Sequence, residues 1–122
     1  MRNSSIMRRE ESPDSGIFTS NLLAFDSDGG VELAGVHAGT VLEVQTKNTA
    51  YTVIPQEGGE LMIWGHPQYC PEPVRIAGIG SCYPTGVMRK DYLGVGMRLS
   101  FRIADHHVTT SRIVKIQAKP RN

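Results

Sequence analysis

The feature that most constrains the fold is an alternation of apolar and polar side chains with a period of two. In the segment 97–103 every second side chain is apolar, and Arg98, Ser100 and Arg102 stand between them. Successive side chains of a β-strand point to opposite faces, so this segment is predicted to be a strand with one buried and one solvated face. Glycine and proline, 13 and 7 of the 122 residues, interrupt every stretch long enough for a ten-residue helix. The chain is therefore predicted to be all-β.

Further segments with the same pattern set the expected number of strands. Residues 41–64 predict a three-stranded meander, and residues 74–79 predict one more strand. Residues 97–103 and 108–117 predict a hairpin with its turn at 104–107, and Asp28-Gly29-Gly30 suits the turn of an earlier hairpin. This spacing favours a small barrel or sandwich of six to seven short antiparallel strands.

The N-terminal part of the chain differs in composition from the rest. Residues 1–16 are polar and without periodicity, so we predict a flexible tail followed by a single small β-barrel domain over residues 17–122. The start of the chain has no apolar core of a secretory signal, and no window approaches the 18 apolar residues of a membrane span. With only two cysteines, a disulfide framework is not expected. We therefore expect a cytoplasmic protein with reduced thiols and no membrane partner.

Charge is distributed unevenly along the sequence. The net charge is +1, but residues 1–72 carry −6 and residues 73–122 carry +7. Such asymmetry can mark a basic surface that meets an anion or a nucleic acid. Strands from both halves can also interleave so that the charges mix, and the short like-charge runs favour this second interpretation.

Two irregular segments interrupt the strand pattern and are the expected binding loops. Residues 65–73 contain three prolines, and residues 81–94 form a long segment with little periodicity. Loops of this kind often carry function. We predict a site where the two loops meet, with six candidate ligand-binding residues: His66, Tyr69, Cys70, Cys82, Tyr83 and Tyr92.

Familiar catalytic and cofactor motifs are missing from the sequence. The pairs Gly78/Gly80 and Gly94/Gly96 are not completed to a dinucleotide fingerprint, and no phosphate-binding loop is present. The histidines and cysteines fit no compact zinc spacing, because no C-x-x-C pair occurs. We therefore predict no metal, no cofactor and no catalytic residue.

Three functions stay open at this stage. The favoured one is a non-enzymatic interaction or ligand-binding module, with a protein or a small molecule as its partner. The first alternative is a nucleic-acid or anionic-ligand binder, whose basic residues would be Arg98, Arg102, Lys115 and Lys119. The second is a metal-dependent or cysteine-based enzyme centred on His66, Cys70 and Cys82. The hydroxyl run Thr109-Thr110-Ser111 is interpreted as structural, since such side chains bond locally to the backbone.

A weak pattern runs through residues 40–117. It combines Leu42-x-Val44-x-Thr46-x-Asn48-x-x-Tyr51, a loop from Gly65 to Pro71-Glu72-Pro73, Gly96-x-x-Leu99-x-Phe101 and Thr109-Thr110-Ser111-x-Ile113-x-x-Ile116. Over these residues the chain resembles short bacterial β-rich proteins of uncharacterised function. The resemblance implies a compact β domain and transfers no site residue.

Overall fold

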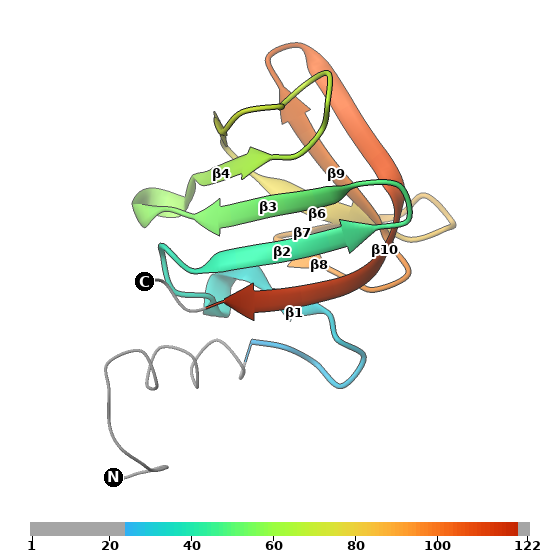
Figure 1. Cartoon of the computed structure of the whole chain (residues 1–122). Helices are drawn as coiled ribbons and strands as arrows, with labels where there is room; N and C mark the ends of the chain where they lie inside the picture. The colour runs from blue at the N-terminus through green and yellow to red at the C-terminus, as the bar shows by residue number, and fades with distance from the viewer. Residues whose placement is uncertain (1–23, 120–122) are drawn as a thin grey trace, which may run out of the picture.

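The computed structural model describes residues 24–119, and this part of the chain is all-β, as the alternation predicts (Figure 1). It contains ten strands. They are β1 (Val31–Glu32), β2 (Val41–Thr46), β3 (Ala50–Pro55), β4 (Leu61–Trp64), β5 (Val74–Ile76), β6 (Ile79–Cys82), β7 (Met88–Lys90), β8 (Tyr92–Leu93), β9 (Arg98–Ile103) and β10 (His106–Lys119). Short 3-10 turns at Leu33–Gly35 and Glu57–Gly59 complete the elements. The predicted tail, residues 1–16, lies outside the described residues.

Eight of the strands form one antiparallel sheet in the order β5-β4-β3-β2-β10-β9-β6-β7, and β1 pairs with β8 as a separate two-stranded sheet. The ladder runs from one edge at β5 to another at β7, so the described strands do not close into a hydrogen-bonded barrel. The strand β5 nevertheless approaches β9 from the far edge. The sheet therefore curls around its core and leaves one seam unpaired.

The long strand β10 makes this curl possible. Its first half pairs with β9 and its second half pairs with β2, with register shifts between Thr109 and Arg112 and between Ile113 and Lys115. Such irregularities bend a strand and increase its twist. At the first shift the Thr110 hydroxyl accepts a hydrogen bond from the Leu99 amide at 3.1 Å and donates to the Ser111 carbonyl. The structural interpretation of the hydroxyl run is confirmed for Thr110.

The core lies on the concave side of the curled sheet. Leu99 and Phe101 of β9 are buried there, while Arg98 and Arg102 are exposed on the outside, as the alternation predicts. The meander predicted over residues 41–64 is confirmed as β2, β3 and β4, whose inward positions include Val44, Val53 and Ile63.

Three expectations about individual segments are wrong. The strand predicted over residues 74–79 breaks at Ala77-Gly78, and its halves, β5 and β6, belong to distant parts of the sheet. Residues 81–94 are not one irregular loop, since they contain the end of β6, all of β7 and β8, and a tight turn between them. The turn expected over residues 104–107 is confined to Ala104 and Asp105, and both histidines belong to β10.

The early hairpin was predicted between residues 22–25 and 31–33, and residues 22 and 23 lie outside the described part of the chain. Within that part, Phe25 forms a bridge with Val31 around the predicted glycine turn. Within residues 24–119 no helix has the length and apolar character needed to cross a membrane.

Candidate functional site

The first predicted loop forms a cluster of tilted aromatic and imidazole rings at one end of the sheet. The Tyr69 ring lies between His66, at a centroid distance of 4.8 Å, and His106, at 5.1 Å. Nδ1 of His66 accepts hydrogen bonds from the amides of Gln68 and Tyr69, which fixes the ring. The thiol of Cys70 is buried, and burial raises its pKa, so it is a poor nucleophile. These contacts hold the loop against the β9–β10 turn.

The second predicted loop, residues 81–94, begins at the opposite end of β9. Ile79 pairs with Phe101 and Cys82 pairs with Arg98, so the turn after β6, with Tyr83, leaves at the Arg98 end. Tyr69 contacts His106, which pairs with Ile103 at the other end. The prediction that both loops meet in one pocket is therefore wrong. The structure brings together His66, Tyr69 and Cys70, and separately Cys82, Tyr83 and Tyr92.

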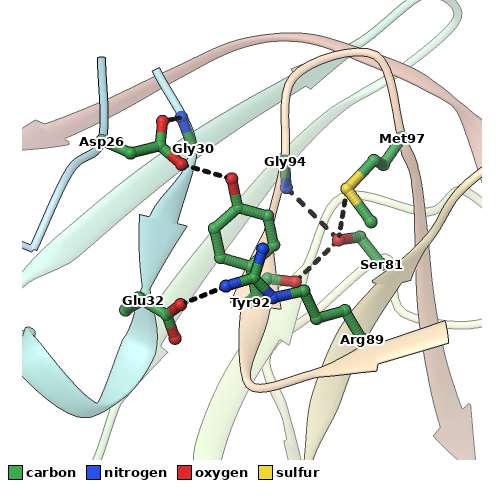
Figure 2. Close-up of polar contacts among 8 residues, drawn as sticks. All are labelled: Asp26, Gly30, Glu32, Ser81, Arg89, Tyr92, Gly94 and Met97. Atoms are coloured by element: carbon green, nitrogen blue, oxygen red, sulfur yellow. Dashed lines mark hydrogen bonds and ion pairs between the residues drawn. The ribbon is translucent and has the colours of Figure 1, made fainter. Parts of the chain in front are cut away.

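Tyr92 is the centre of a polar cluster that ties the N-terminal segment to the sheet (Figure 2). Its hydroxyl donates a hydrogen bond to Oδ2 of Asp26, and Oδ1 of Asp26 accepts from the Gly30 amide at 2.8 Å. Burial and this hydrogen bond raise the pKa of Tyr92 to about 12. The same hydrogen bond lowers the pKa of Asp26 below its usual value.

Arg89 covers the other side of this cluster. Its guanidinium carbon lies 3.8 Å from the centroid of the Tyr92 ring, and one of its nitrogens lies 2.6 Å from a carboxylate oxygen of Glu32 (Figure 2). A depression of ≈ 370 Å³ here is lined by Asp26, Asp28 and Tyr83 as well. Because the arginine is paired and carboxylates surround it, this depression has no free positive charge to offer an anion.

Ser81 supports the cluster from inside. Its fully buried hydroxyl donates to the Tyr92 carbonyl at 2.7 Å and accepts from the Gly94 amide at 3.2 Å (Figure 2). A buried hydroxyl with both roles satisfied stabilises the fold and is not available to a ligand. The cluster is therefore interpreted as structural.

Within the described residues, positive charge without a carboxylate partner gathers instead on the outer face of β9 and β10. Arg98 faces Arg112 directly across the ladder. Lys47 joins them, because its amide donates to the Arg112 carbonyl at 2.8 Å, and the three side chains line a depression of ≈ 500 Å³. Within residues 24–119 none of these cations forms an ion pair with a carboxylate. Like charges placed opposite each other destabilise a sheet, so this arrangement points to an external anion. We call Lys47, Arg98 and Arg112 the cationic trio.

A second depression lies at the other end of the same face. It measures ≈ 510 Å³, and Lys90, Arg102, Ser100 and His107 contribute to its lining, with Asp91 as its carboxylate. The Ser100 hydroxyl lies 2.6 Å from Nε2 of His107. We call this hollow the β9 depression. Arg102 lies four residues from Arg98, so the two depressions are roughly 13 Å apart along the strand.

The other two residues of the predicted anion set lie elsewhere. Lys115 and Lys119 follow the second register shift of β10 and pair with β2. Lys119 is 4.0 Å from a carboxylate oxygen of Glu43. The predicted stripe of four cations is therefore divided, and Arg98 and Arg102 belong to the part that forms no ion pair within residues 24–119.

Sequence reasoning missed Lys47, Lys90, Arg112, Ser100 and His107. The register shift after Thr109 interrupts the alternation of faces, so the sequence pattern does not show on which face of the sheet Arg112 lies. Lys90 belongs to β7, but the sequence predicts a loop over residues 81–94. The alternation did place Ser100 on the outer face, but its complete burial depends on neighbouring strands that are distant in sequence.

The geometry also limits the chemistry of the Ser100–His107 pair. A serine beside an imidazole is the arrangement of a nucleophile and its base. Ser100 is 0% exposed, however, so its oxygen cannot reach a substrate. The hydroxyl instead fixes the orientation of the His107 ring. Among residues 24–119 no group of three or more histidine, cysteine or acidic side chains is arranged to hold a metal ion.

Comparison with protein-family models, with curated proteins and with solved structures found no match for this chain. The resemblance over residues 40–117 stays a prediction.

Proposed function

We propose that this protein is a non-enzymatic cytoplasmic module of open-barrel form that binds an extended anionic ligand on the outer face of β9 and β10. The pair Arg98 and Arg112, opposed across the ladder and joined by Lys47, is the observation that carries the proposal. The trio has no carboxylate partner within residues 24–119, so an anion would relieve its mutual repulsion.

The length of the face argues for a ligand with several anionic groups. The trio and the β9 depression are separated by roughly 13 Å, more than one phosphate or carboxylate group can bridge. The surface between them contains the exposed Thr109, whose neutral hydroxyl does not repel an anion. A chain of phosphates, as in a nucleic-acid backbone, matches this spacing of charge.

A salt series tests the proposal. A fluorescein-labelled single strand of about 16 nucleotides, the upper end of the site sizes of small β modules, is titrated with protein at several salt concentrations. Neutralising a phosphate of a single strand contributes about −0.7 to the slope of log K against log salt, so Arg98→Ala with Arg112→Ala should reduce that slope by about 1.4.

The matched control is the double variant Lys115→Ala with Lys119→Ala, which removes the same charge from β10 opposite β2. We expect it to leave most of the slope in place, since Glu43 already accompanies Lys119. Equal effects of the two double variants would mean that net charge alone drives binding and would overturn the proposed site. No binding at low salt would overturn the function.

A further inference from the structure

The β9 depression is lined by other groups besides cations, and their chemistry limits the class of ligand that it can bind. His107 is exposed, and the contact of its Nε2 with the buried Ser100 hydroxyl holds the ring in one orientation. A ring that is already fixed loses little freedom when a flat ligand stacks on it. Protein aromatic rings, including histidine, are the usual stacking partners of unpaired nucleobases.

The lining also offers both kinds of hydrogen-bonding group. Lys90 and Arg102 donate, the carboxylate of Asp91 accepts, and the Met88 side chain adds an apolar wall. A bare phosphate would be repelled by Asp91, whereas a nucleobase carries both donors and acceptors on its edge. An apolar wall with a few polar groups, in a volume of ≈ 510 Å³, is typical of a site for a small ring system.

On these grounds we propose that the β9 depression receives one base of a single-stranded nucleic acid while the cationic trio holds the phosphates of neighbouring nucleotides. This inference rests on the proposed function and adds the class of ligand. A duplex would keep its bases stacked inside and would offer this depression nothing to bind. One ring at the site corresponds to one stacked base, so recognition depends on an unpaired base and only weakly on sequence.

The test compares two single strands of equal length and equal phosphate number, one with ordinary thymine bases and one built from abasic sugars. We expect the strand with bases to bind about fivefold tighter or more, the lower end of what one base gains by stacking on an aromatic side chain. His107→Ala should remove this difference and leave the salt slope of the abasic strand unchanged.

His106→Ala is the matched control, because this neighbouring imidazole contacts Tyr69 and does not line the depression. It should keep the full preference for the strand with bases. His107→Gln provides a second variant that keeps a side-chain amide near Ser100 without the ring, and it should behave like His107→Ala.

Each result has a definite meaning. Equal binding of the two strands to the wild-type protein would overturn the base-binding inference and leave the anion-binding function standing. Inorganic polyphosphate that binds as tightly as the strand with bases would have the same meaning. The same loss of preference in His106→Ala as in His107→Ala would also overturn it. If neither strand binds at low salt, the proposed function and the inference fall together.

Discussion

At the scale of single residues, the hydroxyl of Tyr92 fastens the N-terminal segment to the sheet. Its pKa is raised from 10 to about 12, first by burial and then by the hydrogen bond to Asp26. A raised pKa in the folded state means that the neutral phenol stabilises the protein fully below pH 10, and that this stability is lost as the pH rises from about 10 to 12. The pair should therefore loosen in alkali.

Tyr92→Phe tests this pH dependence. We expect the variant to have a lower free energy of unfolding than the wild type at pH 8. This difference in free energy should shrink between pH 10 and 12, because only the wild type has a phenol at position 92 that loses its proton in this range. Urea unfolding at a series of pH values measures it. Tyr69→Phe is the control, since the Tyr69 hydroxyl makes no hydrogen bond within residues 24–119. A gap that stays constant with pH would show that burial does not perturb the phenol.

At the scale of elements, the approach of β7 to β6 depends on Gly80. A Cβ atom there would lie 2.6 Å from the Arg89 carbonyl oxygen, which is backbone and cannot move aside alone. Gly80→Ala should therefore push β7 away and destabilise the fold by roughly 1–3 kcal/mol, as overpacking does. Gly78→Ala is the matched control, because a Cβ at Gly78 meets nothing within 4 Å. Thermal unfolding of the two variants gives the comparison, and equal midpoints would contradict the model of a close strand contact.

The strand β9 shows what the sequence could predict and where it fell short. Alternation was sufficient to place Phe101 inside and Arg102 outside, because both faces of β9 are set by local parity. The break at Ala77-Gly78 could not be predicted, since both halves of 74–79 have strand composition and only pairing with different neighbours separates them. The sequence predicted two residues of the candidate site, Arg98 and Arg102. It did not predict Arg112 and His107, because the positions of these two residues depend on the register of β10.

Substitutions on the two faces of β9 should separate stability from binding. Phe101→Ala should cost roughly 3–5 kcal/mol of folding free energy, as for a buried aromatic side chain. Arg102→Ala should change stability by less than about 0.5 kcal/mol, since the side chain is exposed, and should weaken binding of the labelled strand. Chemical unfolding and the binding titration on the same two proteins measure both effects. A large stability loss in Arg102→Ala would mean that this face packs against another part of the chain.

At the scale of the whole molecule, the uneven charge of the sequence becomes an uneven surface. Four cations of the outer face, Lys90, Arg98, Arg102 and Arg112, come from residues 73–122, and Lys47 reaches them through the turn after β2. Acidic residues of the first half form ion pairs with basic residues of the second half, such as Glu32 with Arg89 and Glu60 with Arg75. The predicted mixing of charges therefore occurs at these pairs, whereas the cationic trio has no carboxylate partner within residues 24–119.

The curled sheet should also be unevenly stable, because its strands differ in how many neighbours they have. The edge strands β5 and β7 have three residues each and one partner in the ladder, whereas β3 and β9 are paired on both sides. In native-state hydrogen exchange we expect the amides of Val74–Ile76 and Met88–Lys90 to exchange first and those of Val53 and Leu99 last, since edge hydrogen bonds open without global unfolding. Exchange followed by NMR gives the order residue by residue. Protection of β5 equal to that of β3 would mean that β5 acquires a second partner in solution, in addition to β4.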